Sequence, residues 1–250
     1  MEICKGVKAL DLALKVDSCL IISDVHIGYE ESLNRQGILL PRFQFPEIIK
    51  RLEKIFSSSG KKFSKIIING DLKHDFGTIS EQEWRNILKL IDFLRRHCEE
   101  VIIIKGNHDS SIKPIADKRG VRIADKEVIQ TKHGKILVTH GDKIPPDAKD
   151  YSAIIIGHEH PAISLRKGQR AETYKCYLAG KYKKSILIVQ PSINLINEGT
   201  DIMKEKLLSP FLKQNLCEFS VFVVEDRIYD FGKLKNLRNH KLYKLLYMIS

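Results

Sequence analysis

The chain has 250 residues, of which 43% are hydrophobic and 29% are charged. These values are typical of a soluble globular protein with one large domain, or one domain with a small appendage. The sequence contains no apolar run of the roughly 18 residues that a membrane span requires, and its N-terminus lacks the small-residue cleavage site of a signal peptide. We therefore expect a cytoplasmic protein without a membrane partner.

The cysteine content and the net charge indicate which structural classes and partners are plausible for this protein. Cys4, Cys19, Cys98, Cys176 and Cys217 are odd in number and contain no CxxC pair, which favours free thiols over a zinc ribbon or a disulfide framework. The formal net charge is +11. Such an excess favours a polyanionic partner, nucleic acid first, and the alternative is a lysine-rich surface that serves solubility or heat tolerance.

Buried strands are predicted throughout the first half of the chain. Val7–Leu14 alternates apolar and polar residues, as a half-buried strand does. Three continuous apolar runs predict fully buried strands at Cys19–Ser23, Ile66–Ile68 and Val101–Lys105.

Helices are predicted between these strands. Phe45–Phe56 carries apolar residues at helical spacing, which predicts one helix. Ser80 and Glu83 form a capping box ahead of an apolar stripe, which predicts a second helix over Ser80–Cys98. The polar segment Gly28–Pro46 is predicted to be a long loop beside the first strand end.

Strands dominate the second half. Val128–Thr131 and Lys135–Thr139 predict a hairpin. Further strands are predicted at Ala153–Ile156, Tyr174–Leu178, Ile186–Gln190 and Phe219–Glu225. This order of elements suggests an α/β protein with two sheets packed face to face and helices outside. We expect one domain over residues 1–230 and a basic tail or short helix over residues 231–250.

The predicted buried strands end in residues that can bind metals. Six of the nine histidines lie at these ends. The residues concerned are Asp24 and His26, Asp71 and His74, Asn107 and His108, His140, and His158 with His160. A lone histidine in such a place is more often a hydrogen-bonded loop residue. The whole set predicts a metal site, because neutral imidazoles and carboxylates gathered on one rim are metal ligands.

The number of ligands indicates two ions. A single ion does not need two aspartates, an asparagine and four histidines as ligands. Two ions about 3.5–4 Å apart, bridged by one carboxylate, would coordinate all seven. In such a site a water is acidified to a hydroxide that attacks phosphorus. His74 and His108 are then left to protonate the leaving oxygen or to neutralise the transition state. The mixed ligands suit Mn, with Fe, Zn, Co or Ni as alternatives.

The motifs DVH, GDLKH, GNHD, THGD and GHEH occur in this order between Asp24 and His160. They resemble the five signatures of the calcineurin-like metallophosphoesterase superfamily. The resemblance implies a four-layer αββα sandwich with two mixed inner sheets. It also implies that Asp24, His26 and His160 hold one metal, that Asn107, His140 and His158 hold the other, that Asp71 bridges them, and that His108 is catalytic.

His74 narrows the branch of the superfamily. Phosphoprotein phosphatases usually carry Asp at this position, whereas GDLKH is similar to the motif of the double-strand-break repair nuclease family. The run after Asp24 also resembles the small archaeal and bacterial phosphoesterases related to that nuclease. The chain is short for the capping domain and ATPase-binding tail of the full repair nucleases, so an ATPase partner is not expected. A homodimer is compatible with the sequence.

Basic and aromatic residues elsewhere allow two interpretations. Leu165–Lys184 combines seven Lys or Arg with three tyrosines, which suits single-stranded nucleic acid, but a solvated hairpin with half-buried tyrosines is the slightly favoured interpretation. Arg35 and Arg42 are candidates to clamp a substrate phosphate, with ordinary loop charges as the alternative. Gln190–Asn194 either lines the cleft or makes a turn.

The sequence predicts a dimetal phosphodiesterase acting on nucleic acid or a nucleotide, and its charge and His74 favour a nuclease. The first alternative is a small-molecule phosphodiesterase or phosphatase, such as one acting on cyclic nucleotides. The second is a binding module of the same fold without catalysis, which the complete ligand set argues against.

Overall fold

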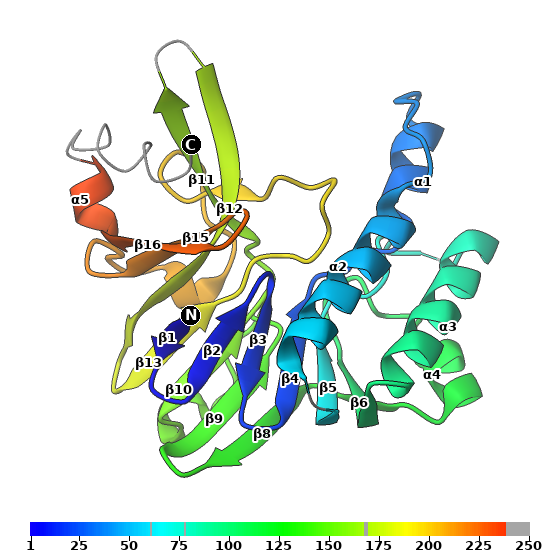
Figure 1. The fold of residues 1–250 in the computed structure, drawn as a ribbon, viewed down its shortest axis with the longest axis horizontal. Coiled ribbons are helices and arrows are strands. Elements are labelled where there is room, and N and C mark those ends of the chain that lie inside the picture. Colours follow the sequence, from blue (N-terminus) through cyan, green and yellow to red (C-terminus); the bar gives the residue numbers. More distant parts are fainter. Residues whose placement is uncertain (61, 78, 168–169, 239–250) are drawn as a thin grey trace.

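Two mixed β-sheets form the centre of the protein in a computed structural model that describes residues 1–60, 62–77, 79–167 and 170–238 (Figure 1). The first sheet follows the strand order β1-β2-β3-β4-β5-β6-β7 and is antiparallel up to β4 and parallel beyond it. Its strands are β1 (Glu2–Cys4), β2 (Val7–Leu10), β3 (Ala13–Val16), β4 (Cys19–Ser23), β5 (Phe63–Asn69), β6 (Cys98–Ile104) and β7 (Arg122–Ala124).

The second sheet follows the order β14-β11-β12-β13-β10-β9-β8, and β12 also pairs with β15, which pairs with β16. Within it β9, β10 and β13 run parallel to one another. Its strands are β8 (Lys126–Thr131), β9 (Gly134–Thr139), β10 (Ala153–Ile156), β11 (Pro161–Lys167), β12 (Arg170–Tyr182), β13 (Ser185–Val189), β14 (Thr200–Asp201), β15 (Ser220–Val224) and β16 (Ile228–Lys233). The predicted sandwich with two mixed sheets is confirmed.

Helices and short helical turns cover the two outer faces. The helices α2, α3 and α4 pack on the first sheet, to the right in Figure 1. An apolar cluster joins the second sheet to η2 and α5. The helical elements are α1 (Tyr29–Arg35), α2 (Gln44–Ser59), α3 (Glu81–Arg95), α4 (Lys113–Arg119) and α5 (Leu234–Arg238), with the 3-10 turns η1 (Ala148–Asp150) and η2 (Pro210–Leu212). No helix in the described part of the chain is both long and apolar enough to cross a membrane.

Local chemistry explains the strongest predictions. Ile66, Ile67 and Ile68 are fully buried in the parallel part of the first sheet, as their continuous apolar run predicts. Helix α3 begins with the predicted capping box, in which Ser80 Oγ accepts from the Glu83 amide while the Glu83 carboxylate accepts from the Ser80 amide.

Several boundaries differ from the sequence predictions. Val7–Leu14 is not one strand, because Asp11 takes a left-handed φ of 56° and turns β2 back into β3. The predicted loop Gly28–Pro46 contains α1. Cys98 belongs to β6 and not to the preceding helix.

The C-terminal half also contains more strand than the patterns predicted. Tyr174–Leu178 is the centre of the long strand β12, whose partner β11 was not predicted. Strand β16 passes the predicted domain boundary at residue 230, and residues 239–250 of the predicted tail lie outside the described residues.

Buried hydrogen bonds connect the two sheets. Tyr177 on β12 is fully buried, and its hydroxyl donates to the carbonyls of Asp11 and Ala13 at 2.7 and 3.0 Å. Gln190, after β13, donates to the carbonyls of Leu12 and Ile21 at 3.0 and 2.9 Å. These bonds fix how the strand ends of one sheet face those of the other.

We predict that Tyr177→Phe lowers the free energy of unfolding by about 1–3 kcal/mol, because two buried carbonyls lose their donor. Tyr174→Phe on the same strand is the control, since the Tyr174 hydroxyl donates to Glu172 near the surface. Urea unfolding of both variants measures the difference. Equal stability of the two variants would show that the bonds between the sheets contribute nothing.

Candidate metal centre

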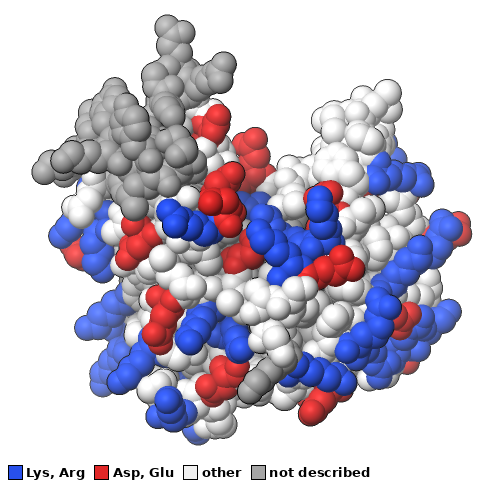
Figure 2. Space-filling view, in the orientation of Figure 1, with Lys and Arg blue, Asp and Glu red and all other residues white. Residues whose placement is uncertain are grey.

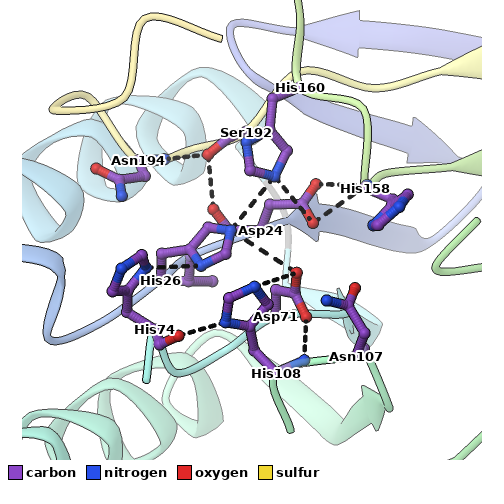
Figure 3. A network of polar contacts seen from close by, with 12 residues as sticks. Asp24, His26, Asp71, His74, Asn107, His108, His158, His160, Ser192 and Asn194 are labelled. Carbon is purple, nitrogen blue, oxygen red and sulfur yellow. Dashed lines mark hydrogen bonds and ion pairs between the residues drawn. The ribbon is translucent and has the colours of Figure 1, made fainter. Parts of the chain in front are cut away.

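Parallel strands bring the predicted ligands to one edge of the sandwich. Parallel strands of one sheet end at the same edge, and the loops that follow them meet there. Strands β4, β5 and β6 of the first sheet and β9 and β10 of the second each run into one of the five motifs. The residues delivered in this way are Asp24, His26, Asp71, Asn107, His108, His140, His158 and His160, and all of them except His140 are labelled in Figure 3.

The backbone at these strand ends is strained. Most of the left-handed residues other than glycine among those described belong to the predicted ligands: Asp24, His26, Asp71, His158 and His160, with φ between 44° and 62°. Such φ values are disfavoured for residues with a Cβ and collect at functional sites. These φ values make the chain turn sharply at the end of each strand, at the edge where the predicted ligands meet.

Two glycines allow the motifs to approach one another. A Cβ on Gly70 would lie 1.9 Å from His140 Nδ1, and the φ of Gly70 is +81°. A Cβ on Gly106 would lie 2.2 Å from Asp71 Oδ1. Both positions require glycine for close contact between neighbouring motifs.

One group of ligands consists of Asp24, His26 and His160. His160 Nε2 lies 3.4 Å from Asp24 Oδ1, and His26 Nε2 lies 3.3 Å from His160 Nε2. Asp24 is fully buried, and His26 and His160 are nearly so. Asn197 contacts Nδ1 of His160 at 3.2 Å and so holds the ring with its other nitrogen towards the group.

The second group consists of Asp71, His140 and His158. His140 Nε2 lies 3.4 Å from Asp71 Oδ2, 3.1 Å from His158 Nδ1 and 3.0 Å from Asn107 Oδ1. Asp71 Oδ2 also lies 3.8 Å from His26 Nε2, in the first group. Asp71 therefore lies between the two groups, where a bridging carboxylate belongs.

These distances fit divalent metal ions. With nitrogen–metal bonds of about 2.1 Å and ligand angles of about 90–109°, two nitrogens on one ion lie about 3.0–3.4 Å apart. The pair His26 and His160 and the pair His140 and His158 have 3.3 and 3.1 Å. Nitrogen and oxygen donors in this mixture suit Mn, Fe, Zn, Co or Ni.

The electrostatics of the centre also favour cations. Burial raises the pKa of Asp71, but His140, His26 and the His108 amide together outweigh burial and hold that pKa well below its usual range. Burial lowers the pKa of His140, yet Asp71 and Asp24 together raise it to about 9. Burial, with His160 next, keeps the pKa of His26 well below its usual value. A metal ion bound at this centre therefore finds His26 already neutral and displaces a proton from His140, whose positive charge it replaces beside the buried carboxylates.

His108 lies over the centre in a fixed orientation. Its backbone amide donates to Asp71 Oδ1 at 2.9 Å, and its Nδ1 contacts the carbonyl of His74. The other ring nitrogen, Nε2, lies 3.9 Å from Asp71 Oδ2. Phe76 stacks on the outer face of the ring with centroids 3.7 Å apart. The ring of His108 is thus held with Nε2 towards the cleft.

The centre opens into a cavity of about 350 Å³. Besides five of the predicted ligands, its lining includes Tyr29, His74, Phe76, His108, Asn194, Asn197, Thr200 and Leu208. The cavity has room for a phosphate and part of one substituent.

A family comparison decides the identity of this arrangement. The calcineurin-like phosphoesterase family matches residues 18–151, which is more than half of the chain and includes four of the five motifs. The chain belongs to the calcineurin-like phosphoesterase family. Membership supports hydrolysis of phosphoesters with divalent metal ions, in agreement with the ligand groups. The fifth motif, GHEH, lies beyond the matched range, and the structure brings it to the same centre.

Similarity to a solved structure supports the fold. A nuclease MPE from Pseudomonas putida superposes with a TM-score of 0.61 at 15% identity, over 89% of this chain and 92% of that one. Vacuolar protein sorting 29 from Cryptosporidium parvum gives a TM-score of 0.40 at 18% identity, over 86% and 97%. An archaeal phosphodiesterase gives 0.38 at 18% identity, over 70% and 83%. No curated protein matches the chain.

The two predicted substrate arginines lie outside the cavity lining. The exposed Arg35, at the end of α1, pairs with Asp75, next to His74. Arg42 is exposed ahead of α2 and forms no ion pair with the described residues. Their role as a phosphate clamp stays a prediction.

Two of the three tyrosines of the basic stretch, Tyr177 and Tyr182, are buried. Tyr174 is half-buried, and its hydroxyl donates to Glu172 near the surface. The two buried tyrosines offer no stacking surface, which favours the hairpin interpretation.

The structure adds residues that the motifs did not single out. Asp109 is fully buried and accepts from the amides of Leu72 and Gly106 at 3.0 Å each, so it holds the Asp71 and Asn107 turns together. Its place at the end of GNHD was the available signal. Phe76 and Asn197 gave no signal in the sequence, because their contacts with the histidines come from folding.

We predict that the protein binds two Mn²⁺ ions per chain and that a chelator lowers its melting temperature. Ligand at about 100 times its Kd stabilises the folded state by about 2.7 kcal/mol per site. Metal analysis and thermal unfolding with and without EDTA measure both effects. His140→Ala should reduce binding, and His133→Ala, at an exposed site between β8 and β9, should not. One ion per chain at saturation would contradict the bridged arrangement.

Proposed function

We propose that the protein is a dimetal-dependent phosphodiesterase and that its substrate is nucleic acid. The convergence of seven predicted metal ligands on one centre, five of which line a single cavity with His108, supports this proposal more than any other observation. Two bound ions, which we expect to be Mn²⁺, supply a nucleophile from water at neutral pH and Lewis-acid stabilisation of the phosphoryl oxygens. The remaining chemistry belongs to the side chains around them.

His108 is the proposed general acid. Its Nδ1–H donates to the His74 carbonyl, so Nε2 faces the cleft, and in the doubly protonated imidazolium form Nε2–H can transfer its proton to the leaving oxygen. Phe76 blocks the outer face of the ring and limits its rotation. A fixed donor near the phosphate reduces the reorganisation that the transition state requires.

His74 has a different role in this proposal. Burial and the neighbouring His108 lower the pKa of His74 to about 4, so its imidazole is neutral at neutral pH. Its Nδ1 lies 3.4 Å from His26 Nδ1, and its ring packs on Tyr29. We assign His74 to positioning His26 through the ring and His108 through the backbone carbonyl.

Charge supports a polyanionic substrate. The chain carries a net charge of +11, and Figure 2 shows Lys and Arg spread over the face in view with fewer Asp and Glu among them. Such a surface attracts nucleic acid and speeds its association. The small-molecule alternative is supported by the volume of the cavity, about 350 Å³, because ligand pockets have volumes in this range.

We predict that His108→Ala lowers kcat by about 10²–10⁴-fold while two ions remain bound, because it removes a proton donor and no metal ligand. His133→Ala, the same change at an exposed histidine, should retain full activity. Steady-state kinetics on bis-p-nitrophenyl phosphate together with metal analysis make the measurement. Wild-type turnover in His108→Ala would remove this residue from the catalytic assignment.

We predict that the Mn²⁺-loaded protein hydrolyses bis-p-nitrophenyl phosphate and cleaves labelled DNA or RNA. A panel with single- and double-stranded DNA, RNA and cyclic nucleotides at one metal concentration separates the candidates, with EDTA as the control. Cleavage of cyclic nucleotides alone would establish the small-molecule alternative. Absence of hydrolysis with any divalent metal would favour the binding module.

A further inference from the structure

The segment after β13, Gln190 to Asn194, enters the centre beside the Asp24 turn. The amide of Ile193 donates to the Ser23 carbonyl at 3.0 Å, and Ser192 Oγ donates to the Asp24 carbonyl at 2.6 Å. The amide of Asn194 donates to Ser192 Oγ at 3.0 Å. Figure 3 shows this chain of contacts from Asn194 through Ser192 to Asp24. Asn194 is therefore anchored to the backbone of a predicted metal ligand.

The side-chain amide of Asn194 is hydrogen bonded at its oxygen, Oδ1, but not, within the described part of the chain, at its nitrogen, Nδ2. Its Oδ1 accepts from the amide of Ile196 at 3.0 Å, which sets the orientation of the carboxamide. Its Nδ2 is buried and has no acceptor among the described residues, although Asn194 is 0% exposed. Buried polar groups are nearly always hydrogen bonded, and exceptions gather at functional sites.

Asn194 also lines the cavity of the metal centre, together with His26, His160, Tyr29 and His74. The free group is a pure donor, so its partner must be an acceptor. The imidazole nitrogens nearby are directed to the metal groups or to each other. The ligand that this cavity is shaped to receive, a phosphate ester, carries acceptor oxygens.

We propose that Asn194 Nδ2 donates a hydrogen bond to a non-bridging oxygen of the substrate phosphate. The inference rests on the proposed function, because it names how the same cavity holds its substrate. A neutral amide contributes at every pH and adds no charge to a centre that already collects cations. Its fixed Oδ1 contact makes the donor preorganised, so little ordering is needed on binding.

Two substitutions at this position separate donation from structure. Asn194→Asp keeps the Oδ1 acceptor for Ile196 and replaces the donor with an acceptor, and Asn194→Ala removes the donor without adding charge. Asn215→Asp is the matched control, because Asn215 Oδ1 accepts from the amide two residues on, Cys217, at 2.9 Å, on the exposed surface.

The first measurement is calorimetric binding of inorganic phosphate and of orthovanadate to the metal-loaded protein. We expect both Asn194 variants to bind two ions and to melt near the wild-type temperature. Phosphate affinity should fall on the order of 10- to 100-fold, as for the loss of one hydrogen bond to a charged group. KM for bis-p-nitrophenyl phosphate should rise in the same proportion, and Asn215→Asp should change neither value.

Two results would overturn the proposal. One is phosphate affinity within about twofold of wild type in Asn194→Ala. The other is loss of metal in step with loss of phosphate, since Asn194 would then act only by holding the Asp24 turn. A wild-type protein that binds phosphate but hydrolyses no ester would refute the proposed function and leave this contact standing.

Discussion

The strained backbone at the strand ends is the constraint on which the site depends. Five predicted ligands have left-handed φ values, and each such residue costs about 1–2 kcal/mol. Hydrogen bonds between the loops maintain the geometry. The amides of Asp24 and His26 donate to the carbonyls of Gly70 and Asp71, and the amide of Gly157 donates to the His140 carbonyl. These hydrogen bonds between the loops therefore hold the predicted ligands in place.

The Asp71 carboxylate connects the two ligand groups electrostatically. It contacts His140 and lies near His26 and His108, and its other oxygen accepts from the His108 amide. Its low pKa and the raised pKa of His140 have the same origin, a buried negative charge that requires a cation. One side chain, that of Asp71, therefore links the two ligand groups and also holds the backbone of His108.

The lining of the cavity combines side chains of different chemistry. The GDLKH and GNHD loops contribute Phe76 and the histidines His74 and His108, with Tyr29 also in the lining, so this part is aromatic and holds the proposed acid. The segment after β13 contributes Asn194, an uncharged donor. Five predicted metal ligands line the same cavity: His26, Asp71, Asn107, His158 and His160. The cavity therefore offers a phosphate ester both a neutral donor and the proposed leaving-group acid.

Sequence patterns determined the residues that make the centre and the strands that carry them. Continuous apolar runs are typical of strands buried in a parallel sheet. The aspartate, asparagine and histidine residues that follow these runs can be recognised in the sequence itself. The fold class followed from the same runs. The patterns failed where one residue reverses the chain, as at Asp11, and where polar residues conceal a short helix, as in α1.

Only the tertiary structure decided the distances between the predicted ligands, that Tyr177 joins the sheets, and that the Asn194 amide nitrogen lines the cleft without an acceptor among the described residues. These features arise between segments far apart in the sequence. A local pattern records which side chains are available and how they alternate, whereas the distance between two loops depends on how the sheets pack. The sequence therefore identifies the residue types that can bind metals and transfer protons, and the packing of the two sheets decides which of their atoms come close together.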